Sequence, residues 1–235
     1  MRPRLEASFY LCDFDGTVAR RDVGNRFFRA FTHDAGAWNA LIDEWRAGRL
    51  GGREVLAREC ELAHVDEARA RAFGRDEDID PGFAAFVGAA RARGDGVAIA
   101  SDGLEFYIRA ILEAHGLGHV PATANRVRFE GARLVPEFAS REGEGCGRCG
   151  NCKGAVLERL ASGYARAVFV GDGLSDRCGA RAAHAVYAKG ELFDWCRAEG
   201  IPARTFATFA DVARAEGLDE FVAGRDMRVS GESRT

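Results

Sequence analysis

Four short apolar runs, separated by segments with helical periodicity, constrain the fold of this chain more than any other feature. Each run has only four or five residues and is largely apolar on both faces, as is typical of a parallel strand that helices cover on both sides. The runs are SFYLC ending at Cys12, GVAIA ending at Ala100, AVFV ending at Val170, and AVYA at 185–188. Helical patterns alternate with them at 82–93, 104–115, 154–161 and 175–183. This alternation predicts an α/β fold built on a doubly wound, mostly parallel sheet with right-handed crossovers.

Two segments interrupt the alternation. The longer one, from Asp22 to Arg75, shows helical periodicity and no strand signal. Apolar residues recur in it at helical spacing, at Trp38, Leu41, Ile42 and Trp45 and then at Val55 and Leu56. We interpret it as an inserted helical subdomain whose aromatic residues form its own core rather than a ligand site. The shorter one, RVRFEGARLVPEF at 126–138, alternates with period two around a central glycine and predicts a β-hairpin.

Composition and charge argue against two classes of partner. The net charge of −3 and the evenly spread arginines provide no basic field, so we expect no nucleic-acid partner. No apolar run approaches the roughly 20 residues that span a bilayer, so we expect no membrane insertion. The apolar part of the N-terminal MRPRLEASFYLC is too short for a secretion signal. Seven cysteines in a chain without such a signal predict reduced thiols and a cytoplasmic protein.

The predicted strands end in polar residues that would meet at one place. In an open α/β sheet, ligands bind at the carboxyl ends of the strands. Two carboxylates follow the first strand, a hydroxyl follows the second, and two more carboxylates follow the third. A lysine stands at the start of the helix that precedes the third strand. These residues are Asp13, Asp15, Ser101, Lys153, Asp172 and Asp176.

The chemistry of this set points to phosphoryl transfer. Four carboxylates cannot lie together in ionised form unless a cation neutralises them, and a hard divalent ion such as Mg²⁺ prefers oxygen ligands. Together with Lys153, Mg²⁺ suits the spread charge of a phosphoryl group. Asp13 could then attack phosphorus, while Asp15 protonates the leaving oxygen and later deprotonates the hydrolytic water. Gly16 supplies the tight turn that directs Asp15 toward the leaving group.

The segments DFDGT, ASDG, CKG and GDGLSD, in that order, resemble the four motifs of the haloacid dehalogenase superfamily of phosphatases. The resemblance covers about residues 8–20 and 80–215. It implies a Rossmann-like catalytic core of residues 1–20 and 79–235 and a small helical cap at 21–78.

The resemblance also implies a role for each motif residue. Asp13 is the nucleophile and a metal ligand, and Asp15 is the acid/base and gives its carbonyl to Mg²⁺. Asp172 binds Mg²⁺ and Asp176 orients the residues around the metal. Ser101 holds a phosphoryl oxygen and Lys153 neutralises charge, so both are catalytic and substrate-binding.

The substrate is predicted less closely. Within the superfamily the chain resembles the phosphoserine-phosphatase-like branch. SDGLEFYIRAIL and the cysteine-rich turn before Lys153 resemble 2-hydroxy-3-keto-5-methylthiopentenyl-1-phosphate phosphatases of methionine salvage. NCKGAVL and the aspartate after Ser101 resemble phosphoethanolamine and phosphocholine phosphatases equally well.

Asp22 and Asp102 bear on this choice. As substrate-binding residues they would form an acidic wall for a cationic substrate, as in phosphoserine phosphatases, which carry a glutamate near the position of Asp22. As helix caps they would leave the substrate neutral. We favour the cap role for Asp102, leave Asp22 open, and therefore favour the neutral methionine-salvage substrate. Three cap arginines that could meet a substrate carboxylate are assigned to a solvated surface: Arg46, Arg49 and Arg53.

The segment GEGCGRCGNCKG places Cys146, Cys149 and Cys152 at the two-residue spacing of a zinc knuckle. Structural Zn²⁺ would need a fourth ligand, such as a distant cysteine or histidine, and no second Cys-x-x-Cys pair provides one. A glycine-rich turn with reduced thiols is therefore the preferred interpretation. The remaining cysteines are assigned to the core: Cys12, Cys60, Cys178 and Cys196.

Two other functions remain open. A phosphotransferase would pass the phosphoryl group from Asp13 to an acceptor other than water, and a non-catalytic protein would only bind a phosphorylated metabolite. The presence of both Asp13 and Asp15 favours an enzyme. A small cap that closes over the site favours a small phosphorylated metabolite as substrate. We expect a monomer or a homodimer.

Overall fold

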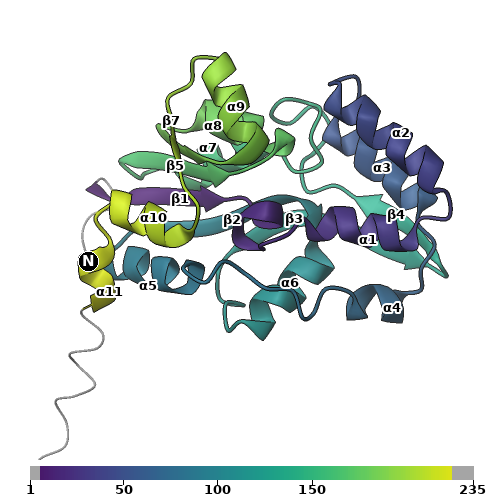
Figure 1. Ribbon diagram of the computed structural model, residues 1–235, viewed down its shortest axis with the longest axis horizontal. Helices are drawn as coiled ribbons and strands as arrows, with labels where there is room; N and C mark the ends of the chain where they lie inside the picture. Colours follow the sequence, from purple (N-terminus) through teal and green to yellow (C-terminus); the bar gives the residue numbers. More distant parts are fainter. Residues whose placement is uncertain (1–5, 224–235) are drawn as a thin grey trace, which may run out of the picture.

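The computed structural model describes residues 6–223, so the basic residues at the extreme N-terminus lie outside the described part of the chain. Within it, seven strands form one sheet in the order β4-β3-β2-β1-β5-β6-β7 (Figure 1). The β3–β4 pair is antiparallel and the other neighbours are parallel. The predicted doubly wound, mostly parallel sheet is confirmed. The strands are β1 Ser8–Cys12, β2 Gly96–Leu104, β3 Ala122–Glu130, β4 Arg133–Glu137, β5 Arg166–Gly171, β6 Ala185–Ala188 and β7 Ala203–Thr205.

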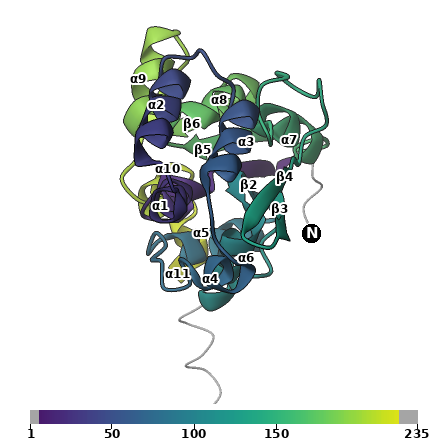
Figure 2. The same ribbon diagram turned by 90° about the vertical axis from the view of Figure 1, so that its right-hand side faces the viewer.

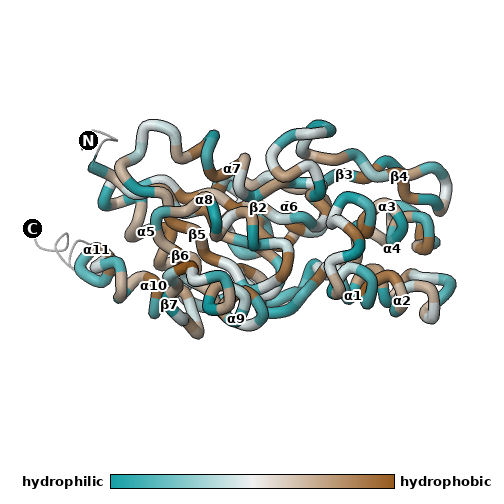
Figure 3. Tube along the Cα trace, turned by 90° about the horizontal axis from the view of Figure 1, so that it is seen from above, coloured by the Kyte–Doolittle hydropathy of each residue, from teal (hydrophilic) through white to brown (hydrophobic). Residues whose placement is uncertain are grey.

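Helices cover both faces of the sheet, which explains why its central strands are apolar throughout. Along β1, Tyr10 and Cys12 belong to one hydrophobic cluster, whereas Phe9 and Leu11 belong to the cluster on the opposite face. The middle of the molecule is accordingly hydrophobic around β5 and β6 (Figure 3). The helices on the first face are α5 Phe83–Arg93, α6 Glu105–Ala114, α10 Phe209–Ala215 and α11 Asp219–Ala223; those on the second are α7 Lys153–Leu160, α8 Arg177–Ala182 and α9 Gly190–Ala198 (Figure 1).

The register of the sheet brings three strand ends together. β1 lies between β2 and β5, and Leu11 pairs with Ala98 on one side and with Phe169 on the other. Because all three strands run in the same direction, the residues that follow them meet at one edge of the sheet.

Of the five α-helices between β1 and β2, four precede α5, as the periodicity of residues 22–75 predicts. α2 and α3 lie side by side at the end of the molecule where β1, β2 and β5 terminate, and α3 packs against β4 (Figure 2). The expectation that this insertion has its own core is wrong, because Trp38 and Leu56 belong to the same hydrophobic cluster as Tyr10. The helices are α1 Val23–Phe31, α2 Ala35–Arg46, α3 Gly52–Leu62 and α4 Glu67–Ala72.

The predicted hairpin is formed by β3 and β4, which turn at Gly131 with a φ of 64°. A left-handed φ of this kind favours glycine, which explains the residue at the centre of the alternating pattern. Among the described residues, no helix combines the length and the apolar character needed to cross a bilayer.

Candidate active site

A tight turn after β1 carries the first two aspartates. The backbone amide of Asp13 donates to the carbonyl of Val170 at 2.8 Å, which continues the β1–β5 pairing, and the short turn η2 (Phe14–Val18) follows. Gly16 in this turn has a φ of 78°, and a Cβ built on it would lie 2.4 Å from Oδ2 of Asp172. The position therefore requires glycine on two grounds, and the turn lies directly against the loop after β5.

Lys153, the first residue of α7, connects two of the motif carboxylates. Its Nζ lies 2.5 Å from Oδ1 of Asp13, 2.5 Å from Oδ1 of Asp176 and 2.9 Å from Oγ of Ser175. Burial by itself lowers the pKa of Lys153, but Asp13 and Asp176 outweigh it, so the pKa is raised and the ammonium form is held. Burial, followed by the charge of Asp176, raises the pKa of Asp13 well above its ordinary value. The fixed lysine cation opposes this rise and favours the anionic form of Asp13.

Asp176 is fully buried, and both of its carboxylate oxygens accept hydrogen bonds. Its Oδ2 accepts the backbone amides of Asp172 at 2.8 Å and Gly173 at 2.9 Å, while its Oδ1 accepts Lys153. It therefore fixes both the loop that carries Asp172 and the lysine that contacts Asp13.

The carboxylates form a site whose chemistry fits a hard divalent cation. Carboxylate oxygens of Asp13, Asp172 and Asp176 lie within 4.8 Å of one another. Burial and the charge of Asp176 raise the pKa of Asp172 to about 6, and Oγ1 of Thr17 donates to its Oδ1 at 3.0 Å. Three carboxylates facing one lysine leave excess negative charge, and an all-oxygen donor set of this kind is the one Mg²⁺ prefers.

Asp15 is held by four hydrogen bonds. Its Oδ1 accepts the amides of Val23 at 2.9 Å and Gly24 at 3.1 Å, at the start of α1. Its Oδ2 accepts the hydroxyls of Ser101 at 3.2 Å and Tyr107 at 3.1 Å. Burial, followed by the charge of nearby Asp22, raises the pKa of Asp15 to about 7. A carboxyl group with this pKa can give and take a proton near neutral pH.

Ser101 and Tyr107 show where sequence reasoning was incomplete. β2 continues to Leu104 rather than ending at Ala100, so Ser101 lies within the strand and accepts the amide of Gly103 at 2.9 Å. Tyr107 was not predicted as a site residue, because on α6 it falls among apolar residues and has the pattern of a core position. A Cβ at Gly103 would lie 1.9 Å from its hydroxyl, so this glycine makes room for the contact with Asp15.

The expectation that Asp102 caps a helix is wrong. α6 begins at Glu105 with Leu104 as its N-cap and without a side-chain cap. Because β2 extends through this position, Asp102 faces β3 and the loop before α7. Its Oδ1 accepts the amide of Asn151 at 2.8 Å and Nδ2 of Asn125 at 3.1 Å.

The cap role that the sequence left open for Asp22 is confirmed. Its Oδ1 accepts the amide of Asn25 at 2.7 Å as the N-cap of α1. It also lines the cavity described next, as does Asp102. Burial raises the pKa of both carboxyls.

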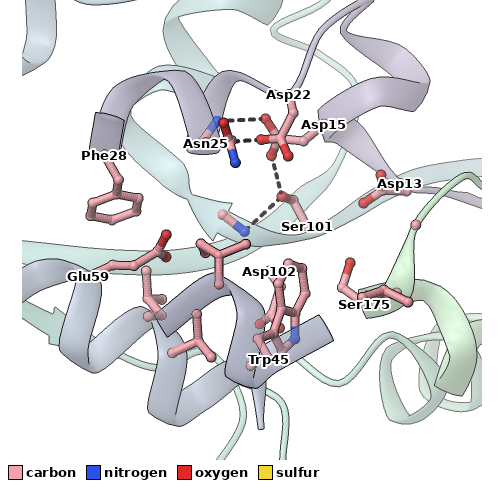
Figure 4. A pocket seen from close by; sticks show the side chains of 18 of the residues that line it. Asp13, Asp15, Asp22, Asn25, Phe28, Trp45, Glu59, Ser101, Asp102 and Ser175 are labelled. Atoms are coloured by element: carbon pink, nitrogen blue, oxygen red, sulfur yellow. Dashed lines mark hydrogen bonds between the residues drawn. The ribbon is translucent and has the colours of Figure 1, made fainter. Parts of the chain in front are cut away.

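A cavity of about 390 Å³ extends from the carboxylates to helices α1, α2 and α3 (Figure 4). Glu59 of α3 faces it and accepts Nε1 of Trp38 at 3.0 Å. Burial raises the pKa of Glu59 to about 8. The part of the wall formed by the helices is otherwise mostly apolar: Phe28, Ile42, Trp45, Val55 and Leu56.

The cap arginines differ from one another. Arg46 is exposed, as its assignment to a solvated surface predicts, and it also lines the cavity. Arg49 pairs with Glu44 at 2.6 Å, and Arg53 lies over the ring of Phe138 at 4.2 Å.

The prediction that four cysteines lie in the core holds for three of them. Cys12, Cys60 and Cys196 are buried as expected. Cys178 is not a core residue: its sulfur joins those of Cys146, Cys149 and Cys152, with all four within 4.8 Å of one another.

Comparisons with known proteins agree with this geometry. The sequence profile of haloacid dehalogenase-like hydrolases matches residues 10–181. The 2-hydroxy-3-keto-5-methylthiopentenyl-1-phosphate phosphatase of Brevibacillus brevis is 30% identical over 206 residues, which cover 86% of this chain and 92% of that one. The protein of the same name from Geobacillus kaustophilus is 30% identical over 214 residues, 87% of this chain and 93% of that one. A solved structure of a phospho-aspartyl intermediate analogue of phosphoserine phosphatase superposes with a TM-score of 0.69 at 20% identity, over 89% of this chain and 99% of that one.

Proposed function

The chain belongs to the haloacid dehalogenase-like hydrolases, and from this premise we propose that it is a Mg²⁺-dependent phosphatase of a small phosphomonoester. The observation that carries the proposal is the pair formed by Asp13 and Asp15. Asp13 is held against a buried lysine cation, whereas Asp15 has a pKa of about 7. Two neighbouring carboxyls with such different environments suit a nucleophile and an acid/base.

The chain's own residues supply both halves of the reaction. Asp13 attacks phosphorus, the bond to the ester oxygen breaks, and Asp15 gives that oxygen its proton. Asp15, now anionic, takes a proton from water as the water attacks the aspartyl-phosphate. Phosphate leaves and Asp13 is a carboxylate again. Ser101 and Lys153 bind the phosphoryl oxygens. A Mg²⁺ ion held by Asp13, Asp172 and the carbonyl of Asp15 would supply further neutralisation of phosphate charge.

For the substrate we propose 2-hydroxy-3-keto-5-methylthiopentenyl 1-phosphate, the compound named in the relatives from Brevibacillus and Geobacillus. The helix-lined end of the cavity supports it, because Phe28 and Trp45 offer aromatic surface to a methylthio group. Glu59 supports it too, since a pKa of about 8 leaves this residue uncharged at neutral pH. An apolar, largely uncharged end suits a neutral chain.

One observation favours a second candidate, an amine-bearing ester such as phosphoethanolamine, phosphocholine or phosphoserine. Asp22 and Asp102 both line the cavity, and a cationic substrate would lower their raised pKa values. Because Oδ1 of each already accepts a backbone amide, we place this candidate second.

We further propose that residues 21–78 act as a cap over a catalytic core formed by 1–20 and 79–235. The cavity wall that α1, α2 and α3 form supports this division. A cap of this kind limits access to small metabolites and excludes bulk water. We also propose that the protein is cytoplasmic, that it is a monomer or a homodimer, and that water is the acceptor of its phosphoryl group.

The test is phosphate release in the presence of Mg²⁺ from the methylthio-ketose phosphate, phosphoethanolamine, phosphocholine and phosphoserine, with the wild type and Asp22→Asn. We expect the methylthio compound to have the highest kcat/KM and Asp22→Asn to change all substrates in parallel. A selective loss on the amines would establish the second candidate. Absence of phosphate release from all four would contradict both. The same assays with added acceptor alcohols would detect a phosphotransferase, because such an enzyme would form an alkyl phosphate in place of free phosphate.

A further inference from the structure

We propose that Cys146, Cys149, Cys152 and Cys178 form a tetrahedral Zn²⁺ site that joins the loop before α7 to α8. The four sulfurs lie within 4.8 Å of one another. Four thiolates around one zinc, at Zn–S distances of about 2.3 Å, stand about 3.8 Å apart. The cluster therefore needs only a small contraction to enclose one ion.

The backbone of the loop before α7 lies close to the sulfurs, as it does in thiolate metal sites. Cys146 and Cys149 are separated by two residues, their sulfurs are 3.3 Å apart, and the amide of Arg148 donates to the sulfur of Cys146 at 3.4 Å. Gly145 has a φ of 63°, and a Cβ there would lie 2.5 Å from the sulfur of Cys152. The backbone thus wraps closely around the thiols.

Cys178 supplies the ligand that the loop lacks. It lies in the first turn of α8, and its backbone carbonyl would be 2.8 Å from a Cβ on Gly154, so α7 and α8 touch beside the cluster. Four sulfur ligands leave no open coordination position, which assigns the ion a structural role.

The proposed zinc site lies between the catalytic lysine and helices α2 and α3. Cys152 directly precedes Lys153, and Cys178 follows Asp176 by two residues, so two of the ligands adjoin the residues that position Asp13. Arg148, between two other ligands, donates to the carbonyl of Gly48 at 2.8 Å, and its own carbonyl accepts the amide of Arg53 at 2.9 Å. One ion would therefore hold the catalytic lysine and a support for helices α2 and α3 at once.

The experiment is elemental analysis of the full-length protein, expressed with zinc available and purified under reducing conditions without chelator. We expect about one zinc per chain, as for a Cys₄ structural site. Cys149→Ser and Cys178→Ser should retain a tenth of this or less, while Cys60→Ser and Cys196→Ser, matched changes at buried cysteines outside the cluster, should retain all of it.

A second measurement covers variants that fold poorly. Reduced wild-type protein stripped of metal should take up one Co²⁺ with the visible and charge-transfer bands of tetrahedral thiolate coordination, and Zn²⁺ should displace it. Full zinc content in Cys178→Ser would overturn the site. A metal-free folded wild type that shows no Co²⁺ bands would do so as well. So would a disulfide between Cys146 and Cys149 found by peptide mapping of the protein as purified under those reducing conditions.

Discussion

Glu59 should make the stability of this protein depend on pH in a way that one substitution removes. Its carboxyl lines the cavity. Burial raises its pKa from 4.5 to about 8, and the hydrogen bond from Trp38 partly opposes this rise. A carboxyl whose pKa is raised in the folded state contributes its full stabilisation when the pH is below its pKa in the unfolded chain. It loses that stabilisation as the pH rises through its folded-state pKa, which for Glu59 is about 8. Wild type should therefore lose more stability between pH 5 and pH 9 than Glu59→Gln, whose amide side chain is always neutral. Both proteins keep the losses that come from Asp15 and Asp172, whose pKa values are also raised.

The size of the loss follows from the environment of the side chain. One pKa unit corresponds to about 1.4 kcal/mol, so the full shift would cost about 5 kcal/mol in a site without water. Glu59 is half-buried against an open cavity, and water there screens the charge, so we expect about 2 kcal/mol. In a domain of this length each kcal/mol moves the melting temperature by about 2–4 °C. Glu59→Gln should melt about 4–8 °C above wild type at pH 9 and within about 1 °C of it at pH 5.

The assay is thermal unfolding of both proteins at unit steps from pH 5 to pH 9. Glu61→Gln is the matched control, since it makes the same change on an exposed residue of α3. Its melting curve should follow that of wild type at every pH. A constant difference between Glu59→Gln and wild type over the whole range would refute the argument, because it would show that Glu59 is ionised throughout.

Three further predictions concern catalysis. Asp13→Asn should reduce turnover to below about 1% of wild type with an unchanged circular dichroism spectrum, because the covalent route is lost; higher residual activity would exclude nucleophilic catalysis by Asp13. Activity should vanish in chelator, return with Mg²⁺ and be inhibited by Ca²⁺, whose longer ligand distances misplace the carboxylates; equal rates with Ca²⁺ would contradict the metal assignment. Asp102→Ala should lower the free energy of unfolding by about 2 kcal/mol, because it removes the acceptor for Asn125 and Asn151. It should also reduce kcat/KM by the same factor for every substrate; a loss confined to amine substrates would show that Asp102 binds them.

The sheet and the motif residues were predictable because their signals are local. β1 and β6 have the bounds that their apolar runs predict, and the hairpin turns at the predicted glycine. Asp13, Asp15 and Asp172 follow the ends of β1 and β5, and Lys153 is the first residue of α7. Ser101 lies inside β2, one residue beyond the predicted end of that strand. Parallel pairing brings such positions to one edge whatever lies between them. β7 was missed because it has three residues, two of them exposed, and no apolar run.

Contacts between distant segments were decided by the tertiary structure. Tyr107 has the spacing of a core residue, and only the packing of α6 beside the turn after β1 brings its hydroxyl to Asp15. Asp102 precedes a helix, but the length of β2 turns it toward Asn125 and Asn151 instead. Cys178 joins three cysteines that lie more than twenty residues before it, because α7 and α8 touch at their first turns. Periodicity along a chain specifies which face of an element is buried, but it carries no information about which residue of another element lies opposite, and that is set by register and packing.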